Sequence, residues 1–321
     1  MASNPNYCDI TPEIEAMAAQ AAGVCSIDPG DYVKYDVKRG LRDLNGNGVL
    51  AGLTEVSEIV AKKIVDGREV PCEGKLYYRG IDVEKLVGSA LKEKRFGFEE
   101  ATYLLLLGSL PNAQQLESFK NQLSYYRSLP NNFVRDIILK APSGDIMNSL
   151  ARSVLNLASY DDRSDDISLP NVMRQCVQLI SLFPMLSVYG YQAWNYKSGS
   201  SLYIHAPRPE LSAAENILTL LRADSSYSFW EAHVLDICLI LHAEHGGGNN
   251  STFTTHVVTS SGTDTYSCMA AALASLKGPR HGGANIKVVQ MFEDMKEHVR
   301  DWKDEDEVRA YLRALLVRRA F

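Results

Sequence analysis

Two glycine-rich stretches, each with a histidine at its edge, hold the side chains best suited to chemistry. The first begins at His242 as HAEHGGGNNST, and the second begins at Gly278 as GPRHGGAN. Both place a histidine where a predicted helix gives way to glycines, which let a small ligand approach the backbone closely. Histidine can donate, accept or carry a proton near neutral pH. The pair indicates a small-ligand site, although a single histidine near a helix end is more often a cap or a core residue.

Metal binding is the first alternative for these residues. His242, Glu244 and His245 all have ligand side chains, but their order and spacing match neither HExxH nor HxxEH. No distant cysteine pair completes a zinc site, so we expect no metal. The stretch Asp43–Gly48 resembles the first half of an EF-hand loop, but Thr54 stands where the bidentate glutamate is needed. We interpret that stretch as the turn of a hairpin.

Other familiar reaction motifs do not occur in the sequence. The glycines follow a predicted helix rather than a strand, and there is no GxGxxG or Walker pattern, which argues against a dinucleotide fold. The lack of a GxSxG elbow argues against a serine hydrolase. Aromatic and methionine side chains at helical spacing in residues 170–196 are interpreted as core or interface residues, not as a cofactor site.

Composition narrows the class of protein and its partners. The chain is 45% apolar and 22% charged, with a net charge of −6 and scattered basic residues, which argues against nucleic acid or an anionic membrane as the main partner. The six cysteines are widely spaced with no CxxC pair, which predicts free thiols and a cytoplasmic location. No signal peptide is visible, and apolar stretches such as Tyr103–Leu107 are too short to span a bilayer.

The predicted secondary structure changes from strand to helix near residue 82, so the expected fold class is mainly α. Residues 32–81 are expected to form short strands with a hairpin turn at Asn45–Gly48. Elsewhere apolar residues recur three and four apart, which is typical of amphipathic helices. The expected helices are Thr11–Ala22, Asp82–Lys92, Phe98–Leu107, Ala113–Leu129, Asp145–Tyr160, Pro170–Trp194, Glu210–Arg222, Tyr227–Glu244, Ser267–Leu276, Ile286–Trp302 and Glu305–Arg319.

Three local signals refine these helices. Asn112 and Gln115 have the spacing of a capping box, and Asp145 is expected to cap the helix that follows it. Pro184 lies inside the long apolar helix and is expected to kink it.

The two histidine motifs also resemble a known family. The stretch HAEHGGGNNSTFTTHVVTSSGTDTYSCMAAALASLKGPRHGGAN resembles the central region of citrate synthases. The resemblance extends to VKRGLRDLNGNGVLAGLTEV, KLYYRGIDVEKL and FEEATYLLLLGSLPNAQQLESF, and so covers most of the chain. It implies a large helical domain with small N-terminal β elements over residues 1–281. Residues 282–321 would be the opening helices of an incomplete small domain, and the protein would be a homodimer.

The family's reaction joins the methyl carbon of acetyl-CoA to the ketone of oxaloacetate and then hydrolyses the citryl thioester. By resemblance, His281 is the neutral imidazole that donates to the thioester oxygen. Ser251 would accept from the other ring nitrogen of His281, and His245 would bind oxaloacetate. His242 and Asn249 would be neighbours of the pocket. Acetyl-CoA is a co-substrate, and no cofactor is implied.

The family pattern also implies residues that this sequence does not contain. Family members continue into a GxGHxVY motif with a second oxaloacetate histidine, then an arginine, the catalytic aspartate and further arginines. None of these motifs occurs before Phe321, and Asp301, Asp304 and Asp306 lie in a charged stretch that does not match. We therefore expect a C-terminally truncated chain without appreciable citrate synthesis.

Two further functions stay open at this point. 2-Methylcitrate synthase, which uses propionyl-CoA, shares the visible motifs. A non-catalytic helical scaffold belongs to a different class, and the intact His281 and Ser251 argue against it.

Overall fold

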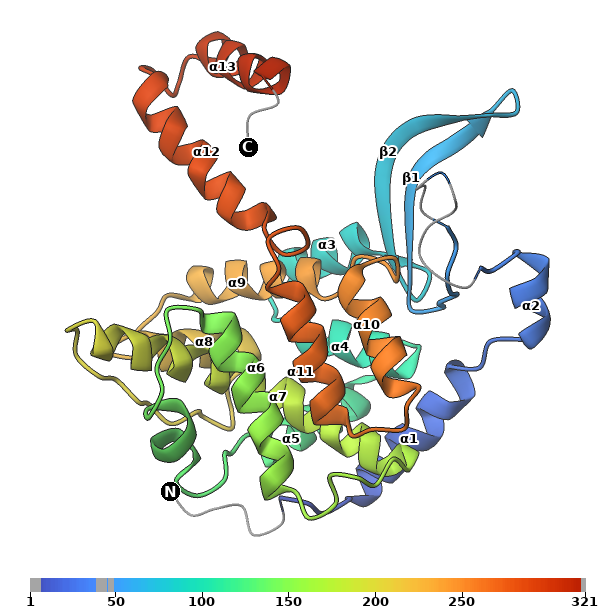
Figure 1. Cartoon of the computed structure of the whole chain (residues 1–321), viewed down its shortest axis with the longest axis vertical. Helices are drawn as coiled ribbons and strands as arrows, with labels where there is room; N and C mark the ends of the chain where they lie inside the picture. The colour runs from blue at the N-terminus through green and yellow to red at the C-terminus, as the bar shows by residue number, and fades with distance from the viewer. Residues whose placement is uncertain (1–6, 39–44, 46–48, 319–321) are drawn as a thin grey trace.

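The computed structural model describes residues 7–38, 45 and 49–318. Helices make up most of it, and a three-stranded antiparallel sheet near the N-terminus is the only sheet among these residues (Figure 1). The predicted fold class, mainly α with small β elements, is confirmed. All six cysteines are free thiols, as expected.

The elements follow one another along the chain with short connections. In order they are α1 Pro12–Val24, α2 Pro29–Lys34, β1 Ser57–Val65, β2 Arg68–Tyr78, β3 Ile81–Asp82, α3 Val83–Glu93, α4 Phe98–Leu107, α5 Ala113–Tyr125, a π-helical turn Val134–Ile138, α6 Ile146–Leu157, a 3₁₀ turn Ala158–Tyr160, α7 Leu169–Lys197, α8 Ala213–Leu221, α9 Phe229–His242, α10 Asn250–Thr259, α11 Thr265–Leu276, α12 Ala284–His298 and α13 Glu305–Arg318.

The helix starts follow local capping chemistry. At α5, the Asn112 side chain accepts from the Gln115 backbone and Gln115 reciprocates, so the predicted capping box is confirmed. Asp145 accepts from the Asn148 backbone at the start of α6, also as predicted. Each cap satisfies backbone N–H groups that have no partner within the helix. The sequence therefore marks most helix starts without help from the rest of the fold.

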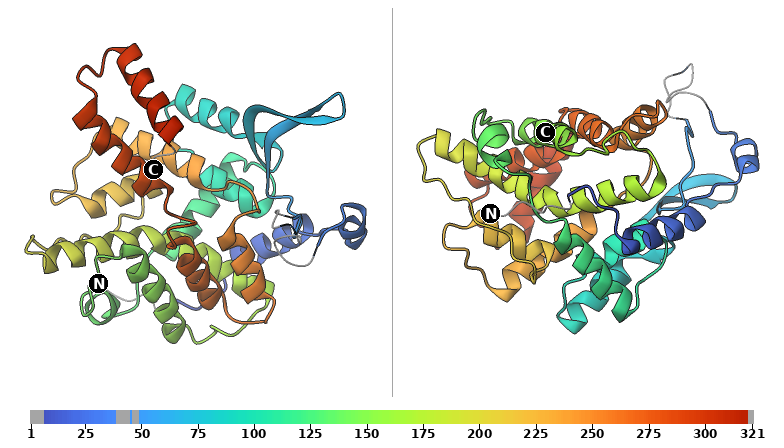
Figure 2. Two further views of the ribbon diagram at one scale, coloured as in Figure 1. Left: turned by 45° about the horizontal axis from the view of Figure 1, so that its top comes forward. Right: turned by 90° about the horizontal axis from the view of Figure 1, so that it is seen from below.

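Strands β1 and β2 form a two-stranded ribbon that projects from the helical body (Figures 1 and 2). The ribbon turns at Asp66 and Gly67, which have φ angles of 50° and 74°. An Asp-Gly pair suits a two-residue hairpin turn, because both central residues need positive φ. The predicted turn at Asn45–Gly48 is therefore not the turn of this hairpin, and residues 43, 44 and 46–48 lie outside the described residues.

Helix α7 forms the centre of the molecule. Its side chains Leu182, Leu186 and Tyr189 are buried, together with Val154 and Leu157 of α6. By length and composition α7 would be able to cross a membrane, contrary to the expectation that every apolar stretch is too short. Its most apolar window is 67% buried inside the fold, as is typical of a core helix. The helix continues through the proline predicted inside it, Pro184.

Helices α6, α11 and α10 lie side by side on one side of α7 (Figure 1). Helix α9 runs beside α3 and α4, and its C-terminal end lies close to the base of the ribbon. Helices α12 and α13 project from the body beyond the end of α11 (Figure 1). Sequence analysis did not predict α2 or α10, and α10 matters because it carries Ser251.

Candidate active site

The turn between α11 and α12 holds His281. The backbone N–H groups of His281 and Gly282 both donate to the Gly278 carbonyl, at 2.9 Å each. A Cβ at Gly282 would lie 2.0 Å from the Leu276 carbonyl oxygen, and a Cβ at Gly283 would lie 2.2 Å from that of Pro279. No side chain fits at either position. The two glycines after the histidine are thus required by the tight turn that places it.

Ser251 and His281 meet across the gap between α10 and the turn after α11. Ser251 lies in the first turn of α10, and its Oγ is 2.8 Å from Nε2 of His281. Asn249 fixes the start of α10, since its side chain accepts from the Thr252 N–H at 2.9 Å. Asn250 joins α10 to α11 through Ser275, at 2.8 Å. The structure therefore brings together the two residues that sequence analysis named as a pair, 30 residues apart.

The direction of the hydrogen bond between Ser251 and His281 determines what the imidazole can do. A neutral imidazole has one N–H. If Nε2 donated to Ser251, Nδ1 would only accept, and His281 would not donate to a ligand. A neutral donor and an accepting serine are therefore incompatible, and that combination of expectations is wrong. The Ser251 hydroxyl must donate to Nε2 for Nδ1 to carry the proton, in competition with the Ala272 carbonyl 3.1 Å from Oγ.

His245 and Asn249 line a hollow of about 390 Å³ beside the glycine run. His245 is exposed, and its walls are completed by the three glycines that follow it and by two residues at the base of β1. Asn249 also donates through Nδ2 to the Gly246 carbonyl at 3.0 Å, so it braces the glycine turn. His281 is not part of the lining of this hollow. That the rings of His245 and His281 face a common cavity stays a prediction.

His242 occupies a different position from the one expected. It is the last residue of α9, and its Nδ1 donates to the Cys238 carbonyl at 2.7 Å, one turn earlier. This contact satisfies an otherwise unpaired carbonyl at the helix end. The residue does not line the hollow beside His245, so its contact with a substrate stays a prediction.

The base of the ribbon supplies residues that sequence analysis missed. Ser57 and Ile59 of β1 line the same hollow as His245. The buried hydroxyl of Tyr78 lies 2.8 Å from the Ile240 carbonyl and 3.0 Å from that of Glu244. These contacts join parts of the chain more than 160 residues apart. No local pattern near residues 57–78 signals them.

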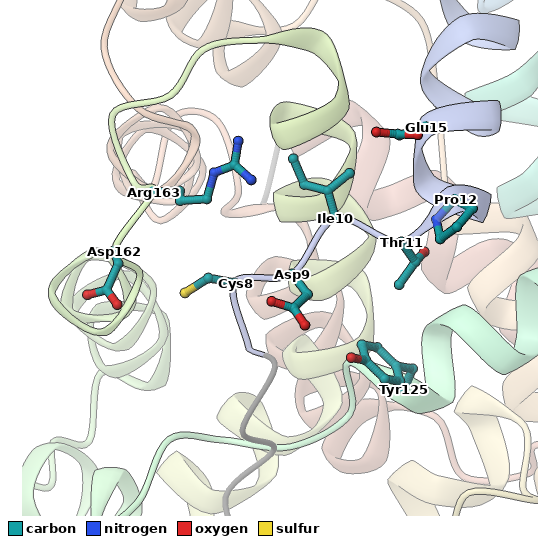
Figure 3. Close-up of a pocket in the computed structure, with 9 residues that line it drawn as sticks. All are labelled: Cys8, Asp9, Ile10, Thr11, Pro12, Glu15, Tyr125, Asp162 and Arg163. Atoms are coloured by element: carbon teal, nitrogen blue, oxygen red, sulfur yellow. The ribbon is translucent and has the colours of Figure 1, made fainter.

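A larger hollow of about 730 Å³ lies between the segment before α1 and the residues after the 3₁₀ turn (Figure 3). It is open to solvent and contains no histidine. Within the part of the chain that the structure describes, no group of three His, Cys, Asp or Glu side chains is arranged to hold a metal ion. Since it includes none of the paired residues, we place the candidate site at the smaller hollow. The lining residues are Cys8, Asp9, Ile10, Thr11, Pro12, Glu15, Tyr125, Asp162 and Arg163.

The fold and the site together define a class of helical proteins that present a serine-braced histidine beside a glycine-lined hollow. Residues 43–320 match the family model described as citrate synthase, C-terminal domain. The chain therefore belongs to the citrate synthase family.

Curated relatives carry two different names. The chain is 32% identical to a 2-methylcitrate synthase of Shewanella oneidensis over 69% of this chain and 55% of that protein. It is 34% identical to a citrate synthase of Deinococcus radiodurans over 70% of this chain and 56% of that protein. The chain thus spans only a little over half the length of these relatives.

Solved structures of similar fold carry the same family name. The citrate synthase of Pyrobaculum aerophilum matches with a TM-score of 0.66 and 29% identity, over 81% of this chain and 63% of that chain. The citrate synthase of Thermotoga maritima matches with a TM-score of 0.62 and 29% identity, over 85% of this chain and 64% of that chain. The predicted citrate synthase-like fold is confirmed.

Proposed function

We propose that the protein catalyses the condensation typical of citrate synthases. The α-carbon of acetyl-CoA loses a proton and attacks the ketone of oxaloacetate, which gives citryl-CoA. Water then hydrolyses the thioester to citrate and free CoA. Acetyl-CoA is a co-substrate in this proposal, and no cofactor or metal takes part. The contact between Ser251 and His281 carries the proposal, because it holds the family's histidine in place within a chain of that family.

His281 would stabilise the enolate that forms when acetyl-CoA loses its proton. With the Ser251 hydroxyl donating to Nε2, the neutral ring keeps its proton on Nδ1 and donates to the thioester oxygen. His245 and Asn249, at the glycine-lined hollow, would bind oxaloacetate, with His242 as a neighbour. In this arrangement one histidine acts on the nucleophile and another holds the electrophile.

A second candidate is 2-methylcitrate synthesis from propionyl-CoA and oxaloacetate. The chain is similar to relatives of both names at nearly equal identity, 32% and 34%. Both reactions use the same enolate chemistry, so the paired Ser251 and His281 support them equally. Comparison of acetyl-CoA and propionyl-CoA in one binding assay separates the two.

We also propose that residues 1–321 alone have no appreciable turnover, because they contain no match to the family's aspartate motif. A missing general base costs on the order of 10²–10⁴-fold in rate. We further propose a cytoplasmic homodimer. Light scattering measures the oligomeric state, and a CoA-release assay measures turnover. Near-normal CoA release from this chain would contradict its proposed inactivity.

The decisive experiment reads the protonation of His281 directly. In ¹⁵N NMR spectra of the neutral ring, we expect a protonated Nδ1 and an unprotonated Nε2. Acetyl-CoA added with oxaloacetate should shift the Nδ1 resonance. His281→Ala should abolish the acyl-CoA effect, whereas His298→Ala, at an exposed histidine that ends α12, should leave it unchanged. A proton on Nε2 of the neutral ring, or no response to either acyl-CoA, would overturn the proposal.

A further inference from the structure

The hydroxyl of Tyr78 ties the end of β2 to the end of α9. The side chain is fully buried, and its oxygen accepts from the Glu244 N–H at 3.2 Å. It donates to one of two carbonyls, that of Ile240 at 2.8 Å or that of Glu244 at 3.0 Å. The last carbonyls of a helix have no partner within the helix. One phenol group thus satisfies the backbone just before His245.

The carboxylate of Glu244 closes the glycine turn from the other side. Its Oε1 accepts from the Gly246 N–H at 2.5 Å and from the Ser57 hydroxyl at 3.1 Å. The three residues come from the two ends of one hollow wall, β1 and the glycine run. Since His245 stands between Glu244 and Gly246, the carboxylate spans the histidine in the sequence and restrains the backbone on both sides of it.

Direct packing completes this restraint. Gly246 has a φ of 99°, and a Cβ added there would lie 2.8 Å from Cδ1 of Ile59. A Cβ at Gly247 would lie 3.3 Å from the Thr54 side chain. The glycine run is therefore pressed against the base of the ribbon, where a side chain would not fit.

We propose that Tyr78 and Glu244 are positioning residues for His245, with the base of the ribbon as their support. They hold the backbone on either side of the histidine and so fix the direction of its ring at the hollow. Sequence analysis interpreted Glu244 as structural; its role here is specific to one neighbour. The consequence for ligand binding rests on the proposed function, in which His245 contacts oxaloacetate.

Tyr78→Phe tests the hydroxyl alone, because the ring stays in place. We expect amide exchange at Glu244 and oxaloacetate dissociation from the chain to rise by about threefold to tenfold, the range for one lost hydrogen bond. Tyr126→Phe is the matched control, since Tyr126 is equally buried and donates to the Asp9 carbonyl at 2.8 Å. This control should lower the melting temperature similarly but leave both readings unchanged.

Glu244 is tested by rescue with a conservative variant. Glu244→Gln keeps an oxygen that accepts from Ser57 and Gly246, so the His245 ring resonances should stay close to those of the unaltered chain. Glu244→Ala removes that oxygen and should broaden or move them.

The outcomes separate the two proposals. Equal amide exchange in Tyr78→Phe and Tyr126→Phe, or equal His245 spectra in Glu244→Gln and Glu244→Ala, would overturn the positioning role. If oxaloacetate leaves the His245 resonances of the unaltered chain unchanged, the proposed function fails at this residue. The exchange comparison would still decide whether the ribbon restrains the turn.

Discussion

One added methyl group is too large for residue 282, although the chain there is exposed. Gly282→Ala would place a carbon 2.0 Å from the Leu276 carbonyl oxygen, so the turn that presents His281 must shift. We expect a loss of about 1–3 kcal/mol in the free energy of unfolding, as for overpacked sites, and a changed His281 spectrum. Denaturant titration and ¹⁵N NMR measure these effects.

Gly278→Ala is the matched control for this prediction. Its Cβ would lie 3.4 Å from the Ser275 carbonyl oxygen, an ordinary contact in the same turn. A similar loss of stability in both variants would show that the turn tolerates the methyl group at residue 282 and that our geometric reason is wrong.

At the residue scale, motif spacing identified the Ser251–His281 pair and placed His245 next to a hollow. It did not identify Ser57, which meets Glu244 across 187 residues of chain. Contacts of that kind depend on how helices and strands pack, and no sequence period encodes them. It also assigned the wrong combination of hydrogen-bond roles to Ser251 and His281, because spacing carries no information about protons.

At the element scale, Asp236 joins α9 to the start of α4. Its fully buried carboxylate accepts from the backbone N–H groups of Gly97 and Phe98, at 2.7 and 3.2 Å. Burial is the largest influence and raises the pKa of Asp236 to about 6, although the two N–H groups act in the opposite direction. The pairing of α4 with α9 is therefore predicted to depend on pH.

The sign of this dependence follows from proton binding. Between its ordinary pKa and about 6, Asp236 is protonated in the folded protein and ionised in the unfolded chain. The contribution of this carboxyl to stability is therefore largest at low pH and declines as pH rises through about 6. From pH 4.5 to 7 we expect a decline of roughly 2 kcal/mol from this group.

Denaturant titrations of the unaltered chain and of Asp236→Asn at several pH values measure that decline. The difference in unfolding free energy between the two proteins should change in the predicted direction, because the asparagine does not titrate. Asp161 contributes in the opposite direction: burial disfavours its charge, but hydrogen bonds from Arg174 prevail and lower its pKa. It is present in both proteins and cancels. A difference that is constant with pH would contradict the prediction.

Local chemistry explains which elements the sequence predicts well. The capping residues Asn112 and Asp145 mark helix starts that the structure reproduces. Helix α10 was missed because its sequence, NSTFTTHVVT, is rich in β-branched residues with low helix propensity, and packing against α11 overrides that preference. The hairpin turn was placed at Asn45–Gly48 although Asp66-Gly67 carries an equally strong turn signal, since the choice depends on which strands pair.

At the scale of the whole molecule, one buried ion pair joins four segments. Arg174 of α7 and Asp161 are both completely buried and paired through Nη2 and Oδ2. Arg174 also contacts Gln178 and the Tyr7 carbonyl, and the Tyr266 hydroxyl of α11 donates to Asp161. The network links α7, α11, the segment before α1 and the residues after the 3₁₀ turn.

Arg174→Met should destabilise the whole fold, because it leaves a buried carboxylate without its cation. We expect a loss of about 3–5 kcal/mol in the free energy of unfolding, measured by denaturant titration. Lys62→Met is the control: Lys62 and Glu69 form an ion pair whose side chains are 64% and 68% exposed. Such surface pairs contribute about 0–1 kcal/mol. Comparable losses in the two variants would contradict the assigned importance of burial.

The mainly α class was predictable because helical periodicity extends over most of the sequence after residue 82. The arrangement of the helices around α7 was predictable only through resemblance to a family. The polar network around Arg174 was not, since its members lie up to 167 residues apart and each looks like an ordinary polar residue in the sequence.

The shared wall of the small hollow has a practical consequence for dissecting the molecule. Residues 57 and 59 supply one side and residues 245–249 the other, with most of the helical body encoded between them. A cut anywhere from α3 to α8 therefore yields two pieces, neither of which possesses a whole pocket. Split halves of this chain would regain the pocket only on reassembly, which makes it a natural reporter of complementation.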